Sequence, residues 1–165
     1  NGTIFSDGID FSNGLLFAAT TGDFFPISQP ITVFMVSKVD TTVPAAGYFS
    51  DSNSFTSLIF YANASSSAIL TGDGATTQIS KGSINTNQAY YTLLANGANS
   101  EIRENGTSVA TGNITAGGLP SGLCVGGIIG SFNLNGHINE LTLFDSDATS
   151  LTTQFESSMA SYYGI

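Results

Sequence analysis

Short apolar runs alternate with turn-forming residues along the chain up to residue 144, and this pattern predicts a fold made of β-strands. The strongest run, Ile31–Val36, is apolar at nearly every position, so we expect a strand that is covered on both faces. Turn signals such as Asn13-Gly14 and Asn135-Gly136 separate the runs. Further strands are predicted at Phe55–Tyr61, Ala68–Leu70, Tyr90–Leu94, Leu123–Val125 and Ile138–Phe144.

The clearest local prediction is a β-hairpin at Asn105-Gly106. Asn-Gly suits a two-residue type I′ turn, because both positions of that turn need positive φ. This turn sets the register, and it places Ile102 on the core face and Arg103 on the opposite face. The predicted pairs are Glu104 with Thr107, Arg103 with Ser108, and Ile102 with Val109.

The end of the chain changes its period and predicts a helix over Ala148–Tyr163. Its apolar stripe, spaced by four, four and three residues, consists of Leu151, Phe155, Met159 and Tyr162. Thr149 or Ser150 is the expected cap at the start, and Gly164 suits the end. We therefore predict an all-β fold, an antiparallel β-sandwich with a short C-terminal helix packed on it, as one domain over residues 1–165.

Charge and composition narrow the classes of function. The 165 residues carry 3 Lys and Arg against 12 Asp and Glu, a net charge of −9. This balance excludes nucleic-acid binding by charge neutralisation and argues against docking on anionic lipid. No apolar stretch is long enough to cross a membrane, so no membrane insertion is expected. Few Lys and many Ser, Thr, Asn and Gly residues favour a secreted or particle-surface protein.

The single cysteine and the first residue of the sequence support two further inferences. Cys124 is the only cysteine, which excludes an intrachain disulfide, and its apolar neighbours predict a buried thiol. The sequence begins with Asn1 rather than Met, so we expect a processed chain or a module of a longer protein.

The order of the motifs resembles laminin-G-like domains of the concanavalin A-like lectin and glucanase superfamily, which are jelly rolls. The resemblance spans nearly the whole chain. It rests on Ile4–Phe17, Ile31–Lys38, Gln88–Leu93, Ser100–Thr111, Leu123–Gly127, Gly136–Leu141 and Leu151–Ile165. Similar domains occur in secreted bacterial proteins and in bacteriophage virion proteins. The resemblance implies two packed sheets, with ligands held on the concave face or by loops at the rim.

The resemblance implies a non-catalytic module that recognises a carbohydrate or cell surface in a larger extracellular or virion assembly, in contact with a glycan, a receptor or other subunits. An alternative is a structural decoration of a capsid, fibre or surface layer that binds no sugar. A glycoside hydrolase is the third option, but the Glu-x-Asp-x-x-Glu motif of related glucanases is absent. Glu101 and Glu104 are three residues apart, so on one strand they face opposite sides.

Aromatic rings are the usual platforms for sugars, and this chain has no Trp. The candidate ligand-binding residues are Tyr48, Tyr61, Tyr90 and Tyr91. Adjacent Tyr90 and Tyr91 must face opposite sides of a strand, so we expect one in the core and the other on an outer face.

No cofactor is required, but many domains of this type hold a structural calcium at the sandwich edge. Asp7, Asp10 and Glu140 are the candidate ligands, because the resemblance makes the first and last strands neighbours. Asp51 and Asp73 are alternatives in loops, and carboxylates in such positions are more commonly solvated turn formers and caps. His137 is assigned no role. Asn-x-Ser/Thr triplets make Asn1, Asn63, Asn105 and Asn113 candidate glycosylation sites.

Overall fold

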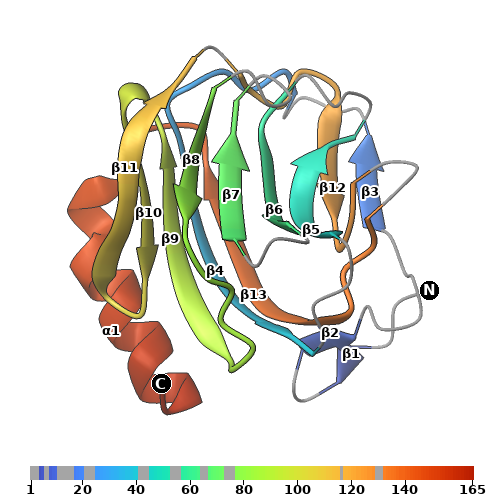
Figure 1. The fold of residues 1–165 in the computed structure, drawn as a ribbon, viewed down its shortest axis with the longest axis vertical. Coiled ribbons are helices and arrows are strands. Elements are labelled where there is room, and N and C mark those ends of the chain that lie inside the picture. The colour runs from blue at the N-terminus through green and yellow to red at the C-terminus, as the bar shows by residue number, and fades with distance from the viewer. Residues whose placement is uncertain are drawn as a thin grey trace.

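The computed structural model describes residues 4–5, 8–10, 17–20, 25–40, 45–52, 57–63, 67–72, 77–115, 117–128 and 132–165. These residues form two antiparallel sheets with one helix beside them (Figure 1). The seven-stranded sheet has the order β1 (Ile4–Phe5), β2 (Gly8–Asp10), β13 (Gly136–Phe144), β4 (Ile31–Val39), β9 (Ala89–Ala95), β10 (Gly97–Glu104) and β11 (Thr107–Ile114). The six-stranded sheet has the order β3 (Phe17–Thr20), β12 (Gly122–Val125), β5 (Ala45–Asp51), β6 (Ile59–Asn63), β7 (Ser67–Thr71) and β8 (Gln78–Lys81). The predicted antiparallel β-sandwich is confirmed.

The main core lies between the two sheets and is built by the side chains that face inward from each. Met35 and Leu93 enter it from one sheet, and Phe60 and Leu70 enter it from the other. Aromatic rings fill the centre, where Phe60 lies 5.6 Å from Tyr91 between ring centroids. The core therefore uses the period-2 alternation of the strands.

A second apolar cluster lies on the other face of the seven-stranded sheet, where α1 (Thr152–Tyr163) covers it. Phe34 and Val36 of β4 point into this cluster, whereas Val33 and Met35 point into the main core. The ring of Phe155 stacks on Phe34 at a centroid distance of 4.3 Å. The prediction that Ile31–Val36 is covered on both faces is confirmed.

The helix departs from its predicted form at its start. A 3-10 turn, η1 (Thr149–Leu151), precedes it, and neither Thr149 nor Ser150 is the cap. Instead Asp147 accepts hydrogen bonds from the Thr149 amide at 3.1 Å and the Thr149 hydroxyl at 2.6 Å. Gly164 ends the helix with a φ of 70°, as predicted.

The apolar stripe is confirmed for Leu151, Phe155 and Met159 but is wrong for Tyr162, whose side chain is 81% exposed. Tyr163 packs against the second cluster in its place. The reason is helical geometry, since a further step of four residues from Met159 keeps the same face and reaches Tyr163.

The predicted hairpin is confirmed at its turn, where Asn105 and Gly106 have φ of 46° and 78°. Glu104 pairs with Thr107 and Arg103 pairs with Ser108, as expected. The third predicted pair is wrong, because a bulge shifts the register and Ile102 faces Ala110 instead of Val109. The other apolar runs fall on strands, although β6 begins only at Ile59 and residues 53–56 lie outside the described part.

Two further sequence predictions concern single features. Cys124 is a buried free thiol, as expected, and burial raises its pKa. Among the described residues, the structure has no helix with the length and apolarity needed to cross a bilayer.

Candidate ligand-binding site

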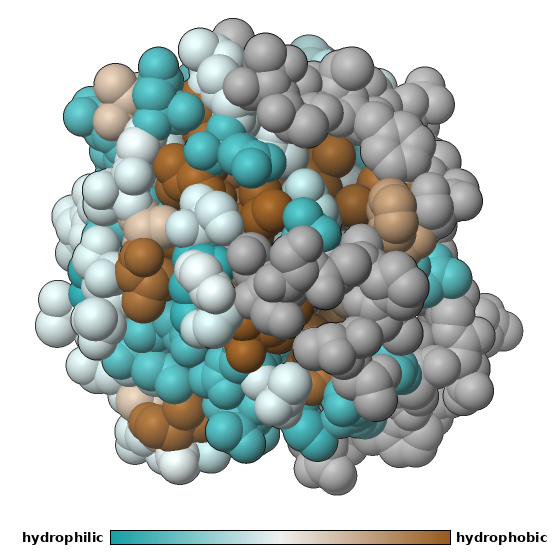
Figure 2. Space-filling view, in the orientation of Figure 1, coloured by the Kyte–Doolittle hydropathy of each residue, from teal (hydrophilic) through white to brown (hydrophobic). Residues whose placement is uncertain are grey.

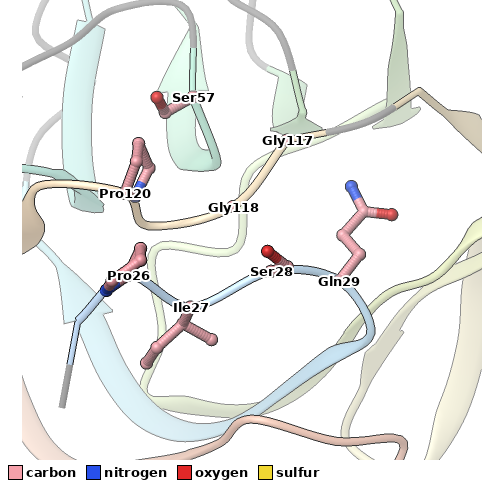
Figure 3. Close-up of a pocket in the computed structure, with 8 residues that line it drawn as sticks. All are labelled: Pro26, Ile27, Ser28, Gln29, Ser57, Gly117, Gly118 and Pro120. Carbon is pink, nitrogen blue, oxygen red and sulfur yellow. The ribbon is translucent and has the colours of Figure 1, made fainter.

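A pocket of about 520 Å³ opens at one rim of the sandwich, between two segments that are distant in the sequence. One segment leads into β4, the other leads into β12, and a serine that precedes β6 completes the wall (Figure 3). The lining residues are Pro26, Ile27, Ser28, Gln29, Ser57, Gly117, Gly118 and Pro120.

The backbones of the two segments are joined by hydrogen bonds. The Ile27 amide donates to the Leu119 carbonyl at 3.1 Å, and the Leu119 amide donates to the Ile27 carbonyl at 2.8 Å. Both side chains are buried in the main core, so the neighbouring Ser28 and Pro120 are directed outward. The Leu58 amide donates to the Gly118 carbonyl at 2.9 Å and holds the third segment in place. The pocket is thus preformed by backbone contacts.

Glycines are required at this rim because other backbone atoms approach closely. A Cβ on Gly117 would lie 1.6 Å from the carbonyl oxygen of Gly72, and one on Gly118 would lie 2.2 Å from that of Ile27. No side chain therefore fits at these two positions of the rim unless the backbone shifts.

The polar groups of the pocket are neutral. The Gln29 side chain accepts a hydrogen bond from the Gly97 amide at 2.7 Å through Oε1. Its Nε2 is buried and has no hydrogen-bond partner within the described residues. The Ser28 hydroxyl is on an exposed residue, and Figure 3 shows it directed between the two segments. The pocket can therefore form hydrogen bonds with hydroxyl groups, and the exposed rings of Pro26 and Pro120 add apolar surface.

Three of the four predicted ligand-binding tyrosines are buried. Tyr48 and Tyr91 are 1% exposed and lie in the main core, and Tyr90 is 7% exposed beneath α1. The prediction is therefore wrong for these three as sugar platforms. Tyr90 and Tyr91 do face opposite sides of β9, but the second sheet covers one side and the helix covers the other. Burial raises the pKa of all three phenols.

A hydrogen-bonded network explains why Tyr48 and Tyr91 tolerate burial. Tyr91 forms side-chain hydrogen bonds with Tyr48 and with Glu104 at the end of β10. Glu104 also pairs with Lys81 and accepts a hydrogen bond from Asn85 at 3.0 Å. The hydroxyl groups of Tyr48 and Tyr91 therefore have hydrogen-bond partners inside the sandwich. Burial of a polar group that has such partners costs little free energy.

Tyr61 is the remaining predicted tyrosine, and it is half-buried. Its neighbours Phe60 and Ala62 point into the main core, so Tyr61 lies on the outer face of the six-stranded sheet. Figure 2 views the molecule from the side of this sheet, where hydrophobic residues of the described part form small separate areas among hydrophilic ones. Tyr61 does not line the pocket, and its role stays a prediction.

The predicted calcium ligands are not brought together by the described residues. Asp7 lies outside the described part, and Asp10 is at the end of β2, opposite His137 of β13. Glu140 is three residues further along β13 and forms a hydrogen bond with the hydroxyl of Tyr163. Nowhere in the described ranges do three His, Cys, Asp or Glu side chains form a group that could hold a metal ion.

Neither the alternative calcium ligand Asp51 nor His137 belongs to a metal-binding group among the described residues. Asp51 is buried and accepts a hydrogen bond from the Ser121 amide at 3.1 Å, whereas Asp73 lies outside the described residues. His137 lies 3.4 Å from Asp40, which also pairs with Lys38 at 2.8 Å.

The candidate glycosylation sites differ in exposure. Asn105 and Asn113 are exposed on the hairpin, and Asn63 is half-buried at the end of β6, while Asn1 lies outside the described part. The side-chain oxygen of Asn105 accepts a hydrogen bond from the Tyr90 amide at 3.0 Å. Modification of these residues stays a prediction.

Sequence reasoning missed the pocket residues. The available signal was a pair of segments rich in breakers, Phe25–Pro30 with two prolines and Gly117–Pro120 with two glycines and a proline. Nothing in the sequence indicates that these two segments lie side by side.

Comparison with solved structures confirms the fold. A Trypanosoma rangeli sialidase in complex with sialic acid matches 96% of this chain with a TM-score of 0.67 at 14% identity. Mouse laminin α1 domains LG4-5 match 88% with a TM-score of 0.60 at 10% identity. The CBM40 of the Ruminococcus gnavus IT-sialidase, bound to α2,3-sialyllactose, matches 87% with a TM-score of 0.61 at 10% identity.

These matches establish a concanavalin A-like jelly roll of the kind found in laminin-G-like domains. This chain spans 29% of the sialidase chain and 44% of the laminin chain, but 89% of the CBM40 chain. No family model and no curated protein matches its sequence.

Proposed function

We propose that this chain is a carbohydrate-binding module that holds a saccharide in the rim pocket and does not alter it chemically. The observation that carries the proposal is a preformed neutral pocket whose polar groups match sugar hydroxyls. The size supports it too, because about 520 Å³ lies within the range of roughly 300–1,000 Å³ that is usual for small-ligand pockets.

Gln29 is the main polar contact that we propose. Its Nε2 is a buried donor without a partner among the described residues, which is a costly state. A small shift of the side chain toward the pocket would let a ligand hydroxyl accept this hydrogen bond. Oε1 is already occupied by the Gly97 amide, so the orientation of the carboxamide is fixed before the ligand arrives. Ser28 would donate or accept a further hydrogen bond, and the rings of Pro26 and Pro120 would contact the C–H groups of the sugar.

The absence of catalysis in this proposal has two supports. The lining residues include no carboxylic acid, whereas glycoside hydrolysis ordinarily uses two carboxyl groups about 5–9 Å apart. Glu101 and Glu104 also act on opposite faces of β10, since Glu101 contacts Arg103 and Glu104 contacts Lys81. The fold is compatible with binding, because the CBM40 that it resembles was solved with sialyllactose bound.

The test is a glycan array followed by calorimetry with the best ligand, using the wild type and two Ser→Trp variants. Ser28→Trp fills the pocket from an exposed position and should abolish binding. Ser161→Trp, at an exposed position near the end of α1, is the matched control and should bind like the wild type. Absence of binding to every glycan, or equal binding by both variants, would reject the proposal.

The setting that we propose is an extracellular or virion surface, as part of a larger assembly. A shallow neutral site binds weakly by itself, and several copies on one particle would raise the avidity. Fusing the chain to a trimerising coiled coil should therefore slow dissociation from a surface that carries the glycan. An unchanged dissociation rate would count against this setting while leaving the site itself intact.

A further inference from the structure

We infer that the rim pocket takes an uncharged saccharide and discriminates against acidic sugars such as sialic acid. This inference rests on the proposed function and deepens it. It also means that the sialylated ligand of the CBM40 structure is not a guide to the ligand of this chain, although the two folds are alike.

Cationic side chains are scarce in this protein. Recognition of a sugar carboxylate ordinarily uses a charge-assisted hydrogen bond from Arg or Lys. The sequence contains only Lys38, Lys81 and Arg103, and the structure describes all three. The residues that it does not describe therefore cannot supply a further Lys or Arg.

Each of these three cations is already paired with a carboxylate. Lys38 lies 2.8 Å from Asp40, and Lys81 pairs with Glu104. Arg103 contacts Glu156 at 2.8 Å and Glu101 at 3.4 Å. Recruiting Arg103 to a ligand would leave the carboxylate of Glu156, which is 8% exposed, without its cation.

All three cations also lie away from the pocket. Gln29 stands just before β4, and Lys38 is near the far end of that strand, roughly 30 Å away at about 3.3 Å per residue. Gly97, which binds Gln29, begins β10, and Arg103 is near the other end of β10, roughly 20 Å away by the same rise. In Figure 1, both strands run downward from the rim that carries the pocket.

Lys81 and His137 also lie at a distance from the pocket. Lys81 is the last residue of β8, and Thr77 directly precedes the first residue of this strand. The Thr77 hydroxyl accepts a hydrogen bond from the Thr115 amide, which lies beside the pocket. From Thr77 to Lys81 the chain covers roughly 13 Å, which exceeds the Debye length of about 8 Å at physiological salt. His137 lies opposite Lys38, at the same distant end as that lysine.

The negative net charge of the protein also disfavours the binding of acidic sugars. At −9 the protein repels anions, and a carboxylate entering this pocket would lose water without gaining a cation. A sugar hydroxyl exchanges hydrogen bonds with water for hydrogen bonds with Gln29 and Ser28 at little cost. The pocket therefore favours neutral saccharides, because it offers no cation to offset the desolvation of an acidic sugar's carboxylate.

The experiment uses pairs of glycans that differ by one terminal acidic residue, such as lactose and α2,3-sialyllactose, on an array at physiological salt. We expect the neutral members to bind and their sialylated partners to bind at least tenfold more weakly. Ser28→Arg places a guanidinium at the pocket and should narrow this difference, whereas Ser161→Arg at the exposed end of α1 should leave it unchanged.

The outcomes separate the inference from the proposed function. Wild-type binding of sialylated glycans as tight as, or tighter than, their neutral partners overturns the inference and leaves the binding module standing. An unchanged ratio in Ser28→Arg also counts against it, because the charge would then be sensed elsewhere. Absence of binding to all glycans rejects the proposed function itself, and the inference with it.

Discussion

Arg103 of β10 donates its Nε hydrogen to Oε1 of Glu156 on α1 at 2.8 Å, beneath a helix that covers the seven-stranded sheet. Glu156 also accepts a hydrogen bond from the Thr92 hydroxyl at 3.0 Å. This contact between two elements that are distant in the sequence fixes the helix on the sheet and explains why a carboxylate is buried in an otherwise apolar interface.

Breaking this pair should destabilise the fold. Glu156→Ala removes the carboxylate that accepts hydrogen bonds from Arg103 and Thr92, and we expect a loss of about 2 kcal/mol in the free energy of unfolding. Urea unfolding followed by circular dichroism measures it. Lys38→Met is the control, because its pair with Asp40 is more exposed and is worth roughly 0–1 kcal/mol. Equal losses in the two variants would contradict this account of Glu156.

Asp147 should make the start of the helix sensitive to acid. Hydrogen bonds from Thr149, and a smaller contribution from Asn96, lower the pKa of Asp147 below its ordinary value. The ionised form therefore contributes stability above the unfolded pKa of about 4, and this contribution is lost as the pH falls through the lower folded pKa.

The matched variant is Asp147→Asn, which keeps the shape of the side chain but does not titrate. Its stability relative to the wild type should rise as the pH falls below about 4, since only the wild type then loses a charge. Asp147→Ala should cost about 1 kcal/mol or less at neutral pH, because the residue is exposed. A stability difference between wild type and Asp147→Asn that is independent of acid pH would show that the carboxylate charge is not used.

Alkaline solution should unfold the protein through its buried phenols. Burial raises the pKa of Tyr48 and Tyr91 far above the ordinary value of about 10. The neutral form is favoured in the folded state, so stability is complete below the unfolded pKa and is lost as the pH rises above it. Phenolate absorbance and near-ultraviolet circular dichroism, titrated together, should show that these two rings ionise only as tertiary structure is lost. Their full ionisation in a chain that keeps its native spectrum would refute the burial.

A methyl group at Gly117, on the rim of the pocket, should destabilise the protein. Gly117→Ala forces a Cβ against the backbone of Gly72, and we expect a loss of about 3 kcal/mol in stability. Gly82→Ala is the control, because a Cβ there meets no atom within 4 Å, and the change should stay within about 0.5 kcal/mol. Thermal unfolding of both variants measures their stabilities, and equal losses in the two would contradict the close approach of Gly117 to Gly72.

The fold could be predicted from the sequence where local pattern decides it. The apolar run of β4, the Asn105-Gly106 turn and the step of four along α1 each predicted the element that forms. Strands such as β5 and β8 were missed because they lack a long apolar run. The bulge after Ile102 depends on pairing across strands, which local pattern does not determine.

The candidate site was predicted much less well, because burial and proximity are set by tertiary packing. Tyr90 has the alternation of an outward residue, and only the docking of α1 covers it. Tyr48 and Tyr91 are buried at low cost because Glu104 and Lys81 supply polar partners from other strands. The pocket joins Ile27 to Leu119, a pairing that no local motif indicates.

The most direct test maps the binding surface by nuclear magnetic resonance during titration with the best neutral glycan from the array. We predict that the shifts concentrate on the backbone amides of Ser28, Gln29, Gly117 and Gly118 and on the side-chain amide of Gln29. Shifts that gather around Tyr61 on the six-stranded sheet, while these amides stay unmoved, would contradict it.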